Sequence, residues 1–309
     1  MTLTNAHTHL ELTNMGYLCP PAPVDFADWI RGLAGHHSLR TPKQIMAGIE
    51  QGITELQACG VTHVGDINTS LLSFEPLARS GLKGIVYLEV FWRQRGRALR
   101  LLQRIQEKIQ EIRRHPLYGD MQIGLTIHAP YSCHPELFRR GAAWCKREAV
   151  PLCIHIAESQ AEVDLLADGS GPFGEDKWYY RWPQKLGIFK RLPTGFRPVE
   201  YLASLGALEA RPLLVHAIRV NADDIRMIAN SGSAVVHCPR SNHLLSCGRM
   251  PLEKYLAAGV DVYLGTDSRV SSPDLNVRAE VEFAKQLHQG FVQPEAIDAM
   301  LAKPFPCEE

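Results

Sequence analysis

The sequence has no excess charge of either sign, because 33 lysines and arginines balance 33 aspartates and glutamates. A neutral chain has no overall field to attract nucleic acid or an anionic membrane, so neither partner is expected. No leader with a basic start and an apolar core opens the chain, and no apolar run approaches the roughly 18–20 residues that span a bilayer. Eight cysteines occur without any CxxC pair, which is typical of reduced thiols in a cytoplasmic protein.

Short β-branched runs alternate with amphipathic stretches along the whole chain. Eight strands are predicted at 3–9, 61–67, 84–91, 121–128, 151–156, 212–217, 234–239 and 260–266, and the clearest helices at 43–58, 97–114, 136–148, 222–230 and 276–288. Eight strand–helix units predict an α/β fold of the (β/α)8 type, a TIM-like barrel that forms one domain over residues 1–309. An open doubly wound sheet is the alternative, but no GxGxxG follows the first strand.

Residues 169–195 interrupt this alternation, between the fifth strand and the next helix. The segment is rich in glycine, proline and aromatic residues. It is interpreted either as a surface loop packed by its own aromatic side chains or as a lid over the mouth of the barrel.

The carboxyl ends of the predicted strands carry most of the chemistry-bearing residues. His7 and His9 end the first strand, and six of the eight strands deliver a histidine or aspartate to one rim, the others being His128, His155 with Glu158, His216, His237 and Asp267. Alternate residues of a strand face the same side, so His7 and His9 both face the lumen. Two imidazoles, a third histidine and an aspartate suit Zn²⁺, with Fe²⁺ as the alternative metal. A hydrogen-bond network without metal is the alternative interpretation.

The ordered motifs resemble those of the amidohydrolase superfamily over roughly residues 3–285. They are His7-Thr8-His9, His128-Ala129-Pro130-Tyr131, His155 with Glu158, His216, His237-Cys238-Pro239-Arg240-Ser241-Asn242 and Gly265-Thr266-Asp267. The branch with the greatest similarity contains nucleoside and nucleobase deaminases, among them aminofutalosine deaminases, together with chlorohydrolases.

This resemblance implies a role for each matched residue. His7, His9, His155 and Asp267 would bind one divalent metal ion. Glu158 would shuttle protons to the ring, His216 and Asp267 would orient and deprotonate the metal-bound water, and His128 would face the substrate. The implied function is deamination of a purine-type ring, as nucleoside or nucleobase, by metal-bound hydroxide, with an aminofutalosine-like compound among the favoured substrates. Two alternatives are hydrolysis of another leaving group, such as chloride, from a heteroaromatic ring, and a truncated, inactive scaffold barrel.

Several features depart from the family or stay open. The predicted fourth strand has no lysine that could bridge two metals, which favours a single ion. No acidic residue near 36–39 matches the one that thioadenosine deaminases use to bind the ribose hydroxyls. The family's accessory β-sandwich is expected to be lacking, so homo-oligomerisation or poor solubility is a hypothesis. Asp66 and Glu89 are expected to be structural residues of the barrel interior. Arg240 either reads a carboxylate or carbonyl of the substrate or forms a salt bridge across the rim.

Overall fold

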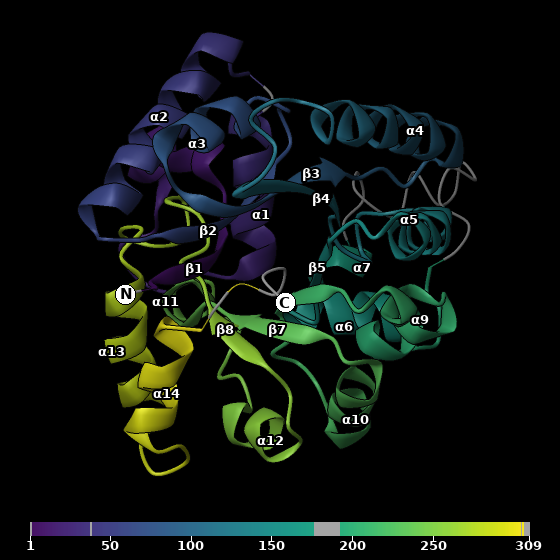
Figure 1. The fold of residues 1–309 in the computed structure, drawn as a ribbon. Coiled ribbons are helices and arrows are strands. Elements are labelled where there is room, and N and C mark those ends of the chain that lie inside the picture. Colours follow the sequence, from purple (N-terminus) through teal and green to yellow (C-terminus); the bar gives the residue numbers. More distant parts are fainter. Residues whose placement is uncertain (1, 38, 176–191, 304, 306–309) are drawn as a thin grey trace.

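The computed structural model describes residues 2–37, 39–175, 192–303 and 305, which form a barrel of parallel strands surrounded by helices (Figure 1). The eight strands are hydrogen-bonded in chain order. They are β1 (Thr4–Thr8), β2 (His63–Asn68), β3 (Lys83–Val90), β4 (Met121–Ile127), β5 (Leu152–Ile156), β6 (Leu213–His216), β7 (Ala234–His237) and β8 (Val262–Leu264). The predicted (β/α)8 barrel is confirmed, and among the described residues no other strand is present.

Helices follow the strands and cover the outside of the barrel (Figure 1). The α-helices are α1 (Phe26–His37), α2 (Pro42–Ala58), α3 (Phe74–Ser80), α4 (Arg95–Ile112), α5 (Pro135–Glu148), α6 (Gln160–Ala167), α7 (Gly171–Glu175), α9 (Pro198–Ser204), α10 (Ala222–Ser231), α11 (Pro239–Leu244), α12 (Leu252–Ala257), α13 (Val277–Leu287) and α14 (Pro294–Leu301). Among the described residues there are also two 3₁₀ segments, η1 (Leu10–Leu18) and η3 (Ala207–Ala210). The five predicted helices correspond to α2, α4, α5, α10 and α13.

Helix α2 shows how local sequence produces these elements. Thr41 caps its first turn by accepting a hydrogen bond from the Gln44 amide, and the Gln44 side chain bonds back to the Thr41 amide. This capping box satisfies amides that have no partner within the helix. Ile49, Ile53 and Leu56 then repeat at helical spacing and are buried against the barrel wall.

The first and last strands complete the barrel. Thr8 and Asp267 form a parallel bridge, and Asp267 donates its amide to the His7 carbonyl at 3.0 Å. The Asn5 side chain accepts from the Thr266 amide at 3.0 Å and donates to its hydroxyl at 2.8 Å. Closure therefore fixes the backbone of β1, which carries His7, against that of Asp267.

An apolar cluster fills the barrel interior. It contains Ala6, Ile67, Ile85, Tyr87, Cys153, Leu213, Val215, Val236, Cys238, Tyr263 and Phe305. A Cβ atom at Gly65 would lie 2.3 Å from the Ala6 carbonyl oxygen and 2.9 Å from Phe305, so only glycine fits there. Apolar side chains thus pack the barrel interior, and polar side chains gather at the carboxyl ends of the strands.

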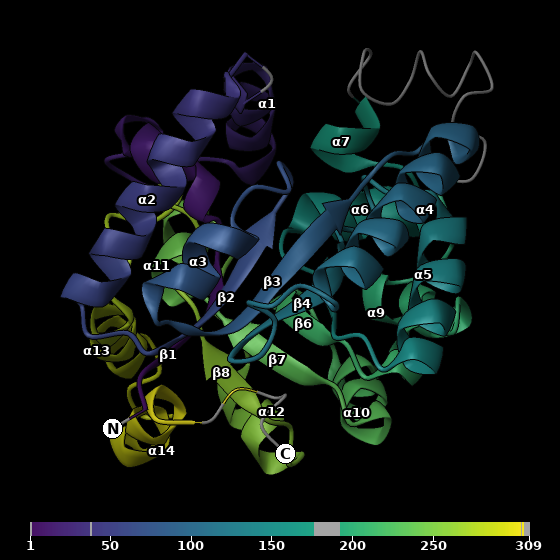
Figure 2. The same ribbon diagram turned by 45° about the horizontal axis from the view of Figure 1, so that its top comes forward.

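The carboxyl ends of the strands face α1 and α7, whereas the first residues of the chain lie at the opposite end (Figure 2). Only residues 169–175 and 192–195 of the predicted lid can be placed. Residues 176–191 lie outside the described residues, and the lid stays a prediction.

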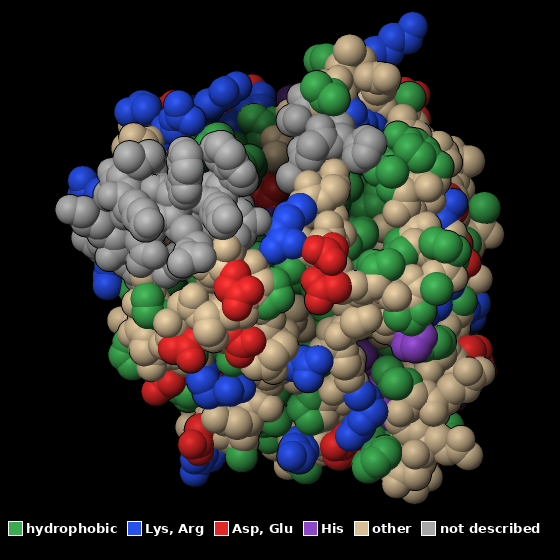
Figure 3. All heavy atoms as spheres, turned by 180° about the vertical axis from the view of Figure 1, so that it is seen from behind, with side chains coloured by type: hydrophobic (Ala, Val, Ile, Leu, Met, Phe, Trp, Pro, Cys, Tyr) green, Lys and Arg blue, Asp and Glu red, His purple; other side chains and the backbone are tan. Residues whose placement is uncertain are grey.

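Charge is mixed on the surface. In the view of Figure 3, acidic and basic side chains lie interspersed over the lower half of the molecule. This distribution agrees with the balanced composition.

None of the described helices combines the length and the apolar character that crossing a membrane requires.

Candidate metal centre and catalytic site

Three imidazoles and one carboxylate converge at the carboxyl rim. The Nε2 atoms of His7 and His9 each lie 3.4 Å from Asp267 Oδ1, and His155 Nε2 lies 3.3 Å from His7 Nε2. His7, His155 and Asp267 are buried, and His9 is only partly exposed. The structure therefore brings together all four residues that the sequence predicted as ligands.

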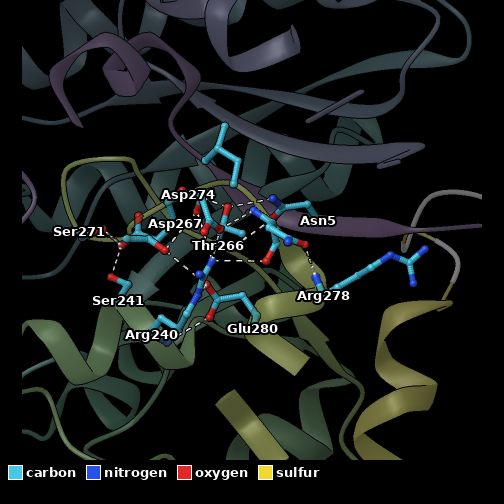
Figure 4. A network of polar contacts seen from close by, with 12 residues as sticks. Asn5, Arg240, Ser241, Thr266, Asp267, Ser271, Asp274, Arg278 and Glu280 are labelled. Atoms are coloured by element: carbon cyan, nitrogen blue, oxygen red, sulfur yellow. Dashed lines mark hydrogen bonds and ion pairs between the residues drawn. The ribbon is translucent and has the colours of Figure 1, made fainter. Parts of the chain in front are cut away.

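Hydrogen bonds outside this cluster orient its members. His155 Nδ1 lies 3.2 Å from the His128 carbonyl oxygen, which only accepts, so Nδ1 carries the proton and Nε2 keeps its lone pair. Asp267 Oδ2 accepts from the hydroxyls of Ser241 at 2.7 Å and Ser271 at 2.9 Å (Figure 4). Oδ1 of Asp267 is then left to face the imidazoles.

The ionisation states of these groups suit a cation. Burial, with repulsion from His7, lowers the pKa of His9 to about 3. Burial and the surrounding histidines likewise hold the pKa of His155 well below its ordinary value. Burial alone would raise the pKa of Asp267, but hydrogen bonding and attraction from His7, together with His9 and His216, hold it well below its usual range.

Neutral imidazoles and an ionised carboxylate form the donor set that zinc and similar divalent metals prefer. Ligand atoms of His7, His9 and Asp267 lie within 4.8 Å of one another, as do those of His7, His155 and His216. The residues present therefore fit a divalent metal ion.

Glu158 and His216 lie directly beside this cluster. His216 Nε2 is 3.4 Å from Glu158 Oε1, and both groups lie with Asp267 inside a 4.8 Å set. With the Asn242 amide oriented as in the structure, its Nδ2 donates to His216 Nδ1 at 3.0 Å, so the His216 proton lies on Nε2. This tautomer makes His216 a donor toward the site and leaves it no lone pair for a metal.

The environment of Glu158 changes its acidity in the opposite direction to that of Asp267. Burial, and then the charges of Asp267 and Glu162, raise the pKa of Glu158 well above its ordinary value. Burial also lowers the pKa of His216 to about 3, although the charge of Asp267 opposes this shift. Neighbouring carboxyl groups with pKa values displaced in opposite directions are typical of acid–base sites.

His128 lies on the side of the cluster formed by β4 and α7. Its ring centroid is 5.3 Å from that of His155 and 5.6 Å from that of Tyr131. Tyr131 in turn stacks on Phe173 of α7 at 5.1 Å. The described part of the 169–195 segment thus reaches the same side of the site as His128.

The first turn of α11 holds Asp267 and His216 in place, a role that the sequence analysis did not assign to it. Ser241 bonds to Asp267, and Asn242 bonds to His216. Arg240 anchors that turn: its Nε lies 2.6 Å from Glu280 Oε1, and its Nη2 lies 2.6 Å from Asp274 Oδ1 (Figure 4). Of the two interpretations of Arg240, the structure therefore shows the salt bridge.

His237 lies outside the cluster formed by the candidate ligands, Glu158 and His216. Its Nε2 is 3.1 Å from Nε2 of His288, which follows α13. Asp66 has a structural position under η1, where its Oδ1 accepts from the Leu10 amide at 2.9 Å.

Comparison with known proteins agrees with this geometry. The model of the amidohydrolase family matches residues 2–302. The chain belongs to the amidohydrolase family. An aminodeoxyfutalosine deaminase of Deinococcus radiodurans is 37% identical over 93% of this chain and 67% of its own length. A 5-methylthioadenosine/S-adenosylhomocysteine deaminase of Carboxydothermus hydrogenoformans is 27% identical over 96% of this chain and 63% of its own length. The chain thus spans about two thirds of the length of these relatives.

Solved structures show the same fold at lower identity. The Helicobacter pylori aminofutalosine deaminase in complex with methylthio-coformycin is 22% identical, with a TM-score of 0.77 over 97% of this chain and 70% of that one. The atrazine chlorohydrolase of Arthrobacter aurescens, solved with zinc, is 19% identical, also with a TM-score of 0.77, over 97% of this chain and 68% of that one.

Proposed function

We propose that this protein is a mononuclear metal-dependent hydrolase that deaminates a purine-type ring. The observation that carries the proposal is the cluster at the carboxyl rim. His7 and His9 Nε2 lie beside Asp267 Oδ1, His155 Nε2 lies beside His7 Nε2, and Glu158 and His216 are directly adjacent. The 37% identity to an aminodeoxyfutalosine deaminase supports an aminofutalosine-like compound as a candidate substrate.

His7, His9, His155 and Asp267 would hold the metal, and Zn²⁺ is the favoured ion. When bound, such an ion lowers the pKa of water from 15.7 toward roughly 7, so that hydroxide is available near neutral pH. β4 carries no lysine that could bridge a second ion, which supports one metal per chain.

The chain's own residues would then move protons and orient the reactants. Asp267 would accept a proton at Oδ1, because two serine hydroxyls occupy its Oδ2. His216 would donate from Nε2 to the oxygen that adds to the ring carbon. Glu158 would carry a proton to the adjacent ring nitrogen and later to the departing ammonia, and its position beside His216 supports this role.

His128 is proposed to contact the substrate from the β4 side. Its ring lies beside that of His155 and is not among the four ligands. The cytoplasmic location, homo-oligomerisation and the lid over 169–195 stay predictions. Light scattering tests homo-oligomerisation, and a monomer at all protein concentrations would contradict it.

Ammonia release tests the proposed function. Zinc-loaded protein is incubated with adenosine, 5-methylthioadenosine, aminodeoxyfutalosine and guanine, and ammonia is quantified. Ammonia from at least one compound is expected. Halide release from a chlorinated heteroaromatic ring, without ammonia from any purine, would favour the hydrolysis of another leaving group. Neither product would favour an inactive scaffold.

A further inference from the structure

Glu89 presents a buried carboxylate oxygen that the proposed chemistry does not use. The residue lies on β3, two residues past Tyr87 of the interior cluster, and is 7% exposed. Its Oε2 accepts from the Thr69 hydroxyl at 2.7 Å. Its Oε1 is buried and has no hydrogen-bond partner among the described residues. A buried acceptor that lacks a hydrogen bond is unfavourable, so a partner that binds there is favoured.

The surroundings of Glu89 decide what kind of partner fits. Ligand atoms of Glu89, His128 and His155 lie within 4.8 Å of one another. His155 cannot serve a second metal, because its Nδ1 donates to the His128 carbonyl and its Nε2 faces His7. Only two ligands would then remain on this side, which is too few for a second ion held by the protein.

His128 offers a second acceptor next to Glu89. The Ser132 hydroxyl donates to the Ala129 carbonyl at 3.0 Å, so at 2.6 Å it accepts from His128 Nδ1–H. His128 Nε2 therefore has a free lone pair in the neutral ring. Two neighbouring acceptors select a ligand that brings two neighbouring donors.

We infer that Glu89 Oε1 and His128 Nε2 form a subsite that accepts hydrogen bonds from a vicinal diol, as in the ribose of a purine nucleoside. The inference rests on the proposed function and deepens it, since it selects a nucleoside over a free base. Glu89 thereby becomes a specificity-determining residue rather than a structural residue of the barrel.

A binding experiment tests this subsite without turnover. Zinc-loaded Glu158→Gln protein is titrated calorimetrically with adenosine and with 2′,3′-dideoxyadenosine. Hydrogen bonds to a charged group contribute about 1.5–3 kcal/mol, so adenosine should bind about 10- to 100-fold more tightly. Adding Glu89→Gln should reduce this ratio to less than about threefold, because an amide there weakens the acceptor.

Glu11→Gln is the matched control. Glu11 is a second buried carboxylate at the rim, and it accepts from Asn68 Nδ2 and the Ser70 amide, each at 3.0 Å. Its replacement should lower the melting temperature but preserve the ratio of the two dissociation constants.

Three results would overturn the inference. The first is an unchanged affinity ratio after Glu89→Gln. The second is a Glu158→Gln protein that shows no preference for adenosine, whether it binds both nucleosides equally or does not bind adenosine. The third is two metals per chain in the Glu158→Gln protein but one after Glu89→Gln is added. The proposed function fails separately: a diol preference without ammonia release by the intact chain would remove the deaminase activity and leave the subsite standing.

Discussion

Replacing Arg240 by methionine should destabilise the fold strongly. Arg240 bonds to Glu280 through both its backbone amide and its Nε, and the Glu280 side chain is completely buried. Methionine keeps much of the apolar volume but leaves the Glu280 carboxylate without its counter-ion. Removing one partner of a buried pair costs about 3–5 kcal/mol, because the other charge stays buried and uncompensated.

Urea denaturation followed by circular dichroism measures this loss, and two further variants identify its cause. Arg240→Met combined with Glu280→Gln should recover part of the stability, since the uncompensated charge is gone. Arg79→Met removes an exposed pair with Glu75 and should change the free energy of unfolding by less than about 1 kcal/mol. A loss below about 1 kcal/mol for Arg240→Met itself would refute the reasoning from burial.

The remaining predictions concern the site. His155→Ala should abolish metal retention, and normal metal content in that variant would remove His155 from the ligands. Glu158→Gln should keep the metal but lower turnover at least about a hundredfold, and near-normal turnover would assign the proton shuttle to another group. Ser241→Ala removes one of the two hydroxyls on Asp267 Oδ2 and should weaken metal affinity or activity about 10- to 100-fold. If a metal titration gives Ser241→Ala the same affinity as the unsubstituted protein, and its activity is also unchanged, Ser271 alone orients Asp267.

Much of the barrel could be predicted because its strands are short β-branched runs that alternate with amphipathic helical stretches. Each predicted strand contains most of the observed one, and the largest differences lie at the ends, as in β8, predicted at 260–266 and observed at Val262–Leu264. The rim cluster could be predicted for a related reason. Carboxyl ends of parallel strands in a closed barrel meet at one face, so residues as distant as His7 and Asp267 must become neighbours.

The supporting contacts could not be predicted, because they depend on side-chain directions that no periodicity encodes. Ser241 and Asn242 stood in the recognised motif, but only the turn of α11 shows that one bonds to Asp267 and the other to His216. Arg240 had two open interpretations until Glu280 of α13 was placed beside it. For Glu89, the signal was an unsatisfied oxygen, which is a property of the packed structure alone.

The central claim is tested most directly by measuring the metal content of the purified protein together with ammonia release from purine nucleosides. The account predicts about one divalent metal ion per chain, bound by His7, His9, His155 and Asp267, and ammonia from at least one nucleoside. A chain that holds its metal but releases no ammonia from any purine would contradict the proposed deamination. A chain that binds no divalent metal would contradict the metal centre itself.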